Sequence, residues 1–342
     1  MLPTAVQRLL TAASLLGMTR LGLVLSAVSG GWLMTYLAFA VEPAGHRNPE
    51  LMKLGLGWAL LASGLAAMGL GVCAIALNDV LDRRQDRAMA RDGGGVDKPV
   101  AAGRVSPRTA TAVAVAALLV AVLSAGVLGV TSFRLAVLLA AGVLFYNFAG
   151  RFLPGIGIVT LGLLHGLALA VPNPEAGFAW PVLLTMSHVM LCGLVRHAFE
   201  DKRPRLGGWG VWGVIVGWGF WSLVVLLLIG ARRETGAAAV GGEVWIGPVS
   251  AVLGFVAFGR WAVSRGGRER FEVVLGRGRA VRFRRLSVGW LVVYDAAWLW
   301  SLGLWWQGFT VIGLLSLVVL AAGLAHDKQA AKGGFIDEFT GR

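Results

Sequence analysis

The sequence is short of charged residues. Only 14% of its 342 residues are charged, whereas 57% are hydrophobic, and the mean hydropathy is +0.73. Soluble domains usually carry about 25% charged residues. This composition excludes an ordinary soluble enzyme or binding module and predicts an integral membrane protein.

Cysteine and acidic residues are also scarce. The two cysteines, Cys73 and Cys192, both lie within apolar runs, so the chain has neither a disulfide framework nor a cysteine zinc site. The 18 acidic residues face 31 Lys and Arg residues, which gives a net charge of +13. Because the basic residues border hydrophobic runs, we expect membrane lipids and diphosphate as their partners rather than nucleic acid.

Long hydrophobic runs dominate what is present. Forty-nine glycines suit close packing of membrane helices, and fourteen tryptophans suit the membrane interfaces. Lipid admits only helices or closed barrels, so we predict an all-α, polytopic membrane helix bundle. It forms a single domain over 1–342, with a core of about 15–325 and a short cytoplasmic tail at 326–342. The predicted spans are 20–40, 55–78, 108–130, 132–148, 155–171, 179–199, 209–230, 245–264, 286–304 and 308–325.

The distribution of basic residues predicts the orientation. With a cytoplasmic N-terminus, the loops at 80–107, 149–154, 200–208 and 265–285 lie in the cytoplasm. All but five of the 31 Lys and Arg residues then lie on or beside that side, as the positive-inside rule expects. The exceptions are Arg47, Lys53, Arg134, Arg232 and Arg233. We predict a multi-pass protein of a bacterial cytoplasmic membrane.

An acidic motif stands where the second span meets a basic loop. In NDVLDRRQD, Asp79, Asp82 and Asp86 recur at i, i+3 and i+7, so on a continuing helix their carboxylates share one face. Such oxygen ligands suit Mg²⁺, which shares its coordination shell with substrate phosphates. The alternative is a solvated helix end whose acidic residues are balanced by neighbouring arginines.

The motif and the segment after it resemble the first signature of the UbiA superfamily of intramembrane prenyltransferases. Asn78, Asp79, Asp82 and Asp86 match its NDxxDxxxD helix end. The segment DKPVAAGRVSP matches the following basic-Pro-x-x-x-Gly-basic pattern through Lys98-Pro99 and Gly103-Arg104. Tyr146 and Arg151, after the fourth span, resemble a tyrosine and a basic residue of that family.

The second signature of the family is degenerate in this chain. LVRHAFEDKRPR, which follows the sixth span, supplies Arg196, Glu200 and Asp201, but Pro204 and Gly208 stand where aspartates would be expected. Three readings remain open. In the first, Glu200 and Asp201 suffice to bind a second metal. In the second, the diphosphate is held mainly by basic residues, namely Arg196, Lys202 and Arg203. In the third, this lineage has lost catalysis.

The resemblance implies a fold, an activity and a set of site residues. The fold is a bundle of nine or ten helices around a central cavity open to the cytoplasm. The activity is Mg²⁺-dependent transfer of a polyprenyl group from a prenyl diphosphate to a lipophilic acceptor, which in that family is often an aromatic ring. Catalytic roles fall to Asp79, Asp82, Asp86 and Asp201, and metal binding to these four and Glu200. Diphosphate binding falls to Asn78, Lys98, Arg104, Arg151, Arg196 and Lys202.

Two other classes of function stay open. One is a UbiA-like protein that binds or transports lipids without catalysis, which the degenerate second motif favours. The other is a phosphotransferase of the CDP-alcohol type, which also uses aspartates at a membrane helix end. That family needs Asp-Gly followed by Ala-Arg, whereas Arg83-Arg84-Gln85 follows Asp82 here.

Three ionisable residues inside the apolar runs are further candidates. Asp295 is a functional candidate because an acid within a membrane span is costly. His165 and His188 could contact an acceptor substrate. For all three we favour a structural role: Asp295 pairs with a neighbouring helix near the membrane edge, and the two histidines are hydrogen-bonded packing residues.

Overall fold

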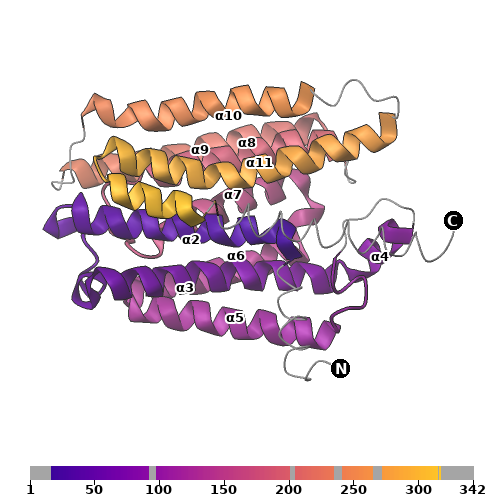
Figure 1. Cartoon of the computed structure of the whole chain (residues 1–342), viewed down its shortest axis with the longest axis horizontal. Helices are drawn as coiled ribbons and strands as arrows, with labels where there is room; N and C mark the ends of the chain where they lie inside the picture. Colours follow the sequence, from indigo (N-terminus) through magenta and orange to yellow (C-terminus); the bar gives the residue numbers. More distant parts are fainter. Residues whose placement is uncertain are drawn as a thin grey trace.

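The protein is all-helical in a computed structural model. The structure describes residues 17–91, 98–200, 205–234, 241–264, 272–314 and 316. These residues contain helices and turns but no strand, which confirms the predicted fold class. The long helices lie side by side along one direction (Figure 1).

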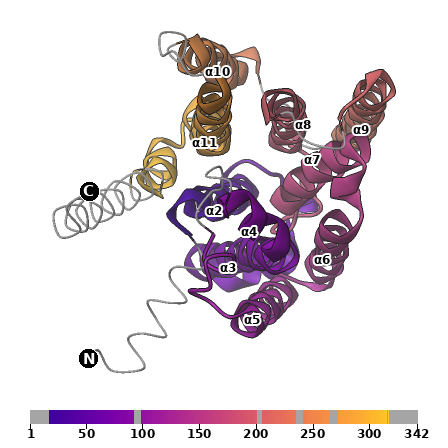
Figure 2. The same cartoon turned by 90° about the vertical axis from the view of Figure 1, so that its right-hand side faces the viewer.

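Ten α-helices have defined bounds. Short 3-10 turns connect some of them: η1 (Ala44–His46), η2 (Gly150–Phe152) and η3 (Gly242–Trp245). Viewed end-on, the short α4 lies across one end of the bundle (Figure 2). The α-helices are α2 (Gly17–Ala40), α3 (Pro49–Leu81), α4 (Arg83–Arg91), α5 (Pro107–Val127), α6 (Val130–Phe148), α7 (Pro154–Ala170), α8 (Trp180–Glu200), α9 (Gly208–Glu234), α10 (Ile246–Ser264) and α11 (Glu272–Ser301).

Each predicted span up to residue 304 falls on one of the long helices. Among the described residues, six helices are long and apolar enough to cross a membrane, and α7 is a shorter apolar helix. The chain is thus a multi-pass membrane protein by helix length and composition. The last predicted span is helical at 305–314, and most of its remainder lies outside the described residues, as does the tail at 326–342. The choice between nine and ten spans stays a prediction.

Two predicted boundaries were wrong. The segment 265–285 was expected to be a loop, yet α11 already begins at Glu272. Its residues are mostly good helix formers and include no proline, so the charge of this run does not prevent a helix. The second span begins at Pro49, capped by Asn48, rather than at residue 55. Gly55 is a kink inside α3, with φ of 71°, a conformation that glycine adopts without strain.

Small residues let α3 and α5 approach closely. α3 also packs against α2, and α2 contacts α7 and α11, so α2 and α3 occupy the middle of the bundle. A Cβ on Gly69 of α3 would lie 2.5 Å from the Ala117 carbonyl oxygen and 2.9 Å from the Ala121 Cβ of α5. The helix backbones are therefore nearly in contact, which is how small residues stabilise membrane bundles.

We expect Gly69→Ala to destabilise the bundle. The added methyl group must push α3 and α5 apart, because the nearest atom belongs to backbone, and such overpacking costs about 1–3 kcal/mol. Gly213→Ala on α9 is the matched control, because its new Cβ would meet open space. Thermal unfolding in detergent should show a lower midpoint for Gly69→Ala and an unchanged or higher one for Gly213→Ala. Equal midpoints would contradict this packing.

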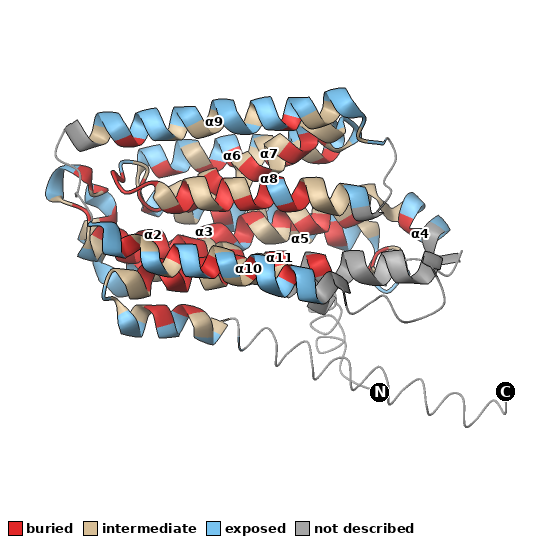
Figure 3. Cartoon of the chain, turned by 90° about the horizontal axis from the view of Figure 1, so that it is seen from above, coloured by how far each residue is buried: buried red, intermediate tan, exposed pale blue. Residues whose placement is uncertain are grey.

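The outer helices expose apolar faces. α9 and α10 are largely exposed in Figure 3, whereas α2 and α3 carry many buried residues. Trp209, at the start of α9, is 92% exposed, and large apolar side chains follow it along the helix. A soluble protein would not leave such faces uncovered, whereas lipid covers them without cost.

The connection topology gathers several segments at one end. Because successive long helices alternate in direction, the connections α3–α5, α6–α7, α8–α9 and α10–α11 all fall at the same end. Figure 1 shows α4 and the start of α11 there. These are the four segments that the charge pattern assigned to the cytoplasm. Which side of the membrane this end faces, and whether a cavity opens there, stay predictions.

Candidate functional site

The acidic motif lies where α3 ends and α4 begins. α3 ends at Leu81, Asp82 has φ of −84° and ψ of −2°, and α4 begins at Arg83. The helix on which the three carboxylates would share one face is therefore interrupted at Asp82. Two hydrogen bonds still cross the break, from Asp82 N to Asn78 O at 2.9 Å and from Asp86 N to Asp82 O at 2.8 Å. The three aspartates stay on consecutive turns.

The carboxylates are buried rather than solvated. Asp79 is 1% exposed and Asp86 is 6% exposed, while the Asp82 side chain is 17% exposed. A solvated helix end would have its acidic residues balanced by the neighbouring arginines. These arginines are less buried than the aspartates, and Arg84 and Arg87 are exposed. A solvated helix end is thus excluded. Buried carboxylates need compensating charge, because desolvating an unpaired ion is costly.

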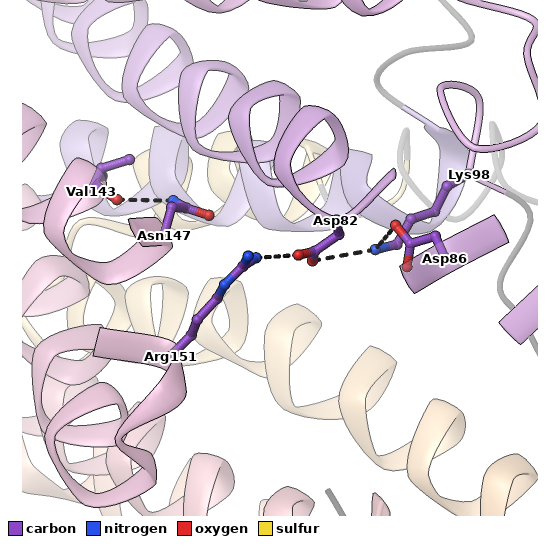
Figure 4. Close-up of polar contacts among 6 residues, drawn as sticks. All are labelled: Asp82, Asp86, Lys98, Val143, Asn147 and Arg151. Atoms are coloured by element: carbon purple, nitrogen blue, oxygen red, sulfur yellow. Dashed lines mark hydrogen bonds and ion pairs between the residues drawn. The ribbon is translucent and has the colours of Figure 1, made fainter. Parts of the chain in front are cut away.

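Lys98 supplies part of this charge. Its Nζ lies 2.7 Å from Asp86 Oδ2 and 3.8 Å from Asp82 Oδ2, so one ammonium group serves two carboxylates (Figure 4). The Lys98 side chain is itself only 15% exposed. The two aspartates therefore face a common point at which a cation is stable.

The loop carrying Lys98 is held in place by its own residues. Val100 and Val105 are fully buried against Val80 of α3 and Ala110 of α5. The Pro99 carbonyl oxygen accepts hydrogen bonds from the backbone of residues 104 and 105, at 3.0 and 3.2 Å. Gly103 closes this turn with φ of 75°, which favours glycine. The basic-Pro-x-x-x-Gly-basic pattern is thus a compact turn that seats Lys98 beside the aspartates.

Arg151 reaches the same aspartate from another part of the chain. It lies in η2, the turn between α6 and α7, and its Nη1 forms an ion pair with Asp82 Oδ1. Its guanidinium lies 4.8 Å from the centre of the Phe152 ring. The turn is tight, because a Cβ on Gly157 would come within 2.6 Å of the Gly150 carbonyl oxygen. The structure therefore joins two of the predicted basic residues, Lys98 and Arg151, to Asp82.

Asn147 is a site residue that the sequence analysis missed. It lies one helical turn before Arg151, near the end of α6, and is 2% exposed. Its amide nitrogen donates to the Val143 carbonyl oxygen at 2.9 Å. Its amide oxygen is buried and has no hydrogen-bond partner among the described residues. The available signal was an amide side chain at the end of an apolar run, beside Tyr146.

The other predicted residues lie elsewhere or cannot be placed. Asn78 is half-buried at the end of α3, and Arg104 is exposed on the Lys98 loop. Arg196 is half-buried on α8. Glu200 is the last residue of α8, but its side chain lies outside the described residues, as do Asp201 and Lys202. The second signature therefore stays a prediction.

The donor set suits a hard cation, although the carboxylates are not gathered around one. Within the described ranges, no three His, Cys, Asp or Glu side chains are close enough together to hold a metal ion. Asp82 and Asp86 nevertheless direct oxygens at one point, where Lys98 provides positive charge. Carboxylate oxygens are the ligands that Mg²⁺ prefers. The aspartates are thus chemically suited to bind Mg²⁺. In this structure the Lys98 ammonium group lies at the point that their oxygens share.

The three ionisable residues for which a structural role was predicted have protein partners. The two ring nitrogens of His188 lie 3.2 Å from the Tyr294 hydroxyl and 2.9 Å from the Ser287 carbonyl oxygen. Asp295 accepts a hydrogen bond from the Ser29 hydroxyl of α2. His165 Nδ1 lies 2.8 Å from the Leu161 carbonyl oxygen in its own helix. These contacts support the structural interpretation of all three residues.

Three solved structures resemble the chain over most of its length. No family model and no curated protein matches it. A UbiA homologue from Archaeoglobus fulgidus, bound to DMAPP and Mg²⁺, is 14% identical, with a TM-score of 0.48, and the match covers 82% of this chain and 97% of that one. A UbiA homologue from Aeropyrum pernix K1 is 17% identical, with a TM-score of 0.42 and coverage of 89% and 97%. A digeranylgeranylglyceryl phosphate synthase is 13% identical, with a TM-score of 0.42 and coverage of 92% and 96%.

Proposed function

We propose that this protein is a UbiA-type prenyltransferase of the membrane. It would transfer a polyprenyl group from a prenyl diphosphate to a lipophilic acceptor. In this reaction the bond between the prenyl C1 and the diphosphate oxygen breaks, and a bond between C1 and the acceptor forms. The acceptor loses a proton, and diphosphate leaves.

The observation that carries the proposal is the cluster of Asp82, Asp86, Lys98 and Arg151. It combines buried acids with two cations at one end of an apolar bundle. A structural ion pair needs only one acid and one base, whereas this cluster brings two acids and two basic residues together from two separate connections, α3–α5 and α6–α7. A prenyl diphosphate matches this arrangement. Its charged diphosphate would bind to the cluster at the end of the bundle, and its apolar prenyl tail would lie among the helices.

Each residue has a distinct part in the proposed reaction. Asp82 and Asp86, with Asp79 one turn earlier, would hold Mg²⁺, which neutralises the departing diphosphate when bound. Lys98 and Arg151 would bind the diphosphate oxygens and stabilise the charge that develops on them. Apolar side chains would keep water away from the allylic cation until the acceptor attacks. Asn78, Arg104, Arg196, Glu200, Asp201 and Lys202 stay proposed members of the site.

Product analysis tests the proposed function. Purified protein would be incubated with Mg²⁺, labelled prenyl diphosphates of several chain lengths and a pooled lipid extract. We expect one labelled lipid whose mass has grown by a prenyl group, together with released diphosphate, only when Mg²⁺ is present. Prenyl-diphosphate binding without a product would favour the lipid-binding alternative. The absence of binding would contradict the proposal.

A further inference from the structure

Arg151 and Asn147, which lie one helical turn apart, each have a buried polar atom without a hydrogen-bond partner among the described residues, and the two atoms are complementary. Arg151 Nε carries a hydrogen-bond donor, Asn147 Oδ1 is an acceptor, and neither has a hydrogen-bond partner among the described residues. Figure 4 shows the Asn147 oxygen on the side of that residue where the Arg151 guanidinium lies. An unsatisfied buried polar group costs about 1–3 kcal/mol, so two of them in one place require an explanation.

The orientation of the Asn147 amide is fixed by its helix. If the amide were turned over, its oxygen would face the Val143 carbonyl oxygen, and two acceptors would repel each other. The amide nitrogen must therefore bond to Val143, which leaves the oxygen directed away from its own helix.

The other buried asparagines of the described structure are satisfied on both sides. Asn48 accepts from Glu50 N at 3.2 Å and donates to the Leu128 carbonyl oxygen at 2.7 Å. Asn173 accepts from Asn48 N and donates to the His46 carbonyl oxygen, each at 3.0 Å. Both tie connections together at the opposite end of the bundle. Asn147 differs from them because, among the described residues, only its amide nitrogen has a hydrogen-bond partner.

We propose that Asn147 is a positioning residue for Arg151 in the substrate-bound state. In the structure described, Asp82 draws the guanidinium toward itself, which leaves Arg151 Nε and Asn147 Oδ1 unpaired. When Asp82 turns to a cation, Arg151 loses its partner. Arg151 Nε then donates to Asn147 Oδ1, and the terminal nitrogens of the guanidinium are directed at the diphosphate. This inference rests on the proposed function. It adds that Arg151 changes its partner from Asp82 to Asn147 when substrate binds.

The burial of both atoms favours this internal pairing over an external ligand. Each atom is almost inaccessible to solvent, so a substrate group cannot reach either without movement of the side chains. Arg151 is the group able to move, because its side chain is 20% exposed and it lies in a turn rather than within a helix. A planar guanidinium can bond to the amide through Nε while its other nitrogens bind phosphate.

A double-mutant cycle in ligand binding tests the proposal. The four proteins are the native chain, Asn147→Leu, Arg151→Lys and the double variant. The probe is a geranylgeranyl thiolodiphosphate, which does not ionise readily, with Mg²⁺, and its dissociation constant is measured in detergent. We expect Asn147→Leu to weaken binding about tenfold in the native background and less than twofold in the Arg151→Lys background, since lysine has no Nε donor at that position.

Thermal unfolding of the same proteins without ligand is the second readout. Because Asn147 and Arg151 are not bonded to each other in that state, Asn147→Leu should shift the midpoint equally in both backgrounds. Leu139→Val, a buried change elsewhere on α6, controls for disturbance of the helix and should leave binding within twofold. Asn147→Ser, whose shorter side chain cannot reach the guanidinium, replaces Asn147→Leu if the leucine variant does not fold.

Each outcome decides a different question. Equal weakening by Asn147→Leu in both backgrounds, or no weakening in either, would overturn the role of Asn147 while leaving the proposed function intact. Coupling already present in the ligand-free unfolding data would also overturn it, because the pairing would then not depend on substrate. Absence of Mg²⁺-dependent probe binding by the native protein would overturn both the proposed function and this inference.

Discussion

Replacing Asp82 with alanine is expected to lower the rate of Mg²⁺-dependent prenyl transfer by roughly a thousandfold or more. Asp82 is the residue that both cations of the site contact, Lys98 through one oxygen and Arg151 through the other. A metal commonly stabilises a departing anion by several kcal/mol, and each 1.36 kcal/mol is a factor of ten in rate. The initial rate of labelled product formation measures the loss.

Glu50→Ala is the matched control for this substitution. Glu50 lies on the same helix, α3, but near its other end, where its exposed carboxylate pairs with Lys53 at 2.7 Å. We expect native activity from this variant, and both variants should elute as folded protein in detergent. Full activity of Asp82→Ala would remove the central residue from the proposed site.

Lys98→Met is expected to change two affinities in opposite directions. Lys98 places its ammonium group at the point that Asp82 and Asp86 share, so it competes with any metal that binds there without substrate. Removing it should strengthen binding of Mg²⁺ alone by about tenfold. The same change should weaken binding of a prenyl thiolodiphosphate by about tenfold, because a charge-assisted bond to phosphate is lost.

Lys53→Met serves as the control for Lys98→Met. It removes the same kind of charge from an exposed ion pair of α3, and surface pairs contribute about 0–1 kcal/mol. Both affinities should therefore stay at their native values. If Lys98→Met weakened both affinities, the lysine would be holding the loop together rather than competing with a cation.

Residue patterns predicted the bundle and the acidic motif because each depends on local chemistry. Apolar length alone places the spans. The pattern from Lys98 to Arg104 was identified only as a match to the family signature, and the structure shows it to be a turn held by Val100, Val105 and Gly103. The helix starts at Pro49 and Glu272 were missed because hydropathy identifies only the apolar part of a helix. It does not detect a first turn that begins with proline or a helix end made of charged residues.

The finer arrangement of the site depends on contacts between distant segments. The pairing of Asp82 with Arg151, 69 residues later, brings the turn after α6 to the end of α3. No spacing in the sequence encodes that meeting. Asn147 was overlooked because one amide in an apolar run carries no pattern, and only the structure shows that its oxygen lacks a partner. The resemblance to the UbiA superfamily came from the first signature, while the second lies largely outside the described residues.

Metal binding that depends on substrate is the most direct test of the site. Mn²⁺, which takes the same oxygen ligands as Mg²⁺, would be titrated into the protein with and without a geranylgeranyl thiolodiphosphate, and its bound fraction followed by electron paramagnetic resonance. We predict that the probe strengthens Mn²⁺ binding to the native protein at least tenfold and has no such effect in Asp82→Ala. Equal Mn²⁺ binding by the two proteins in the presence of the probe would contradict a metal site at these aspartates.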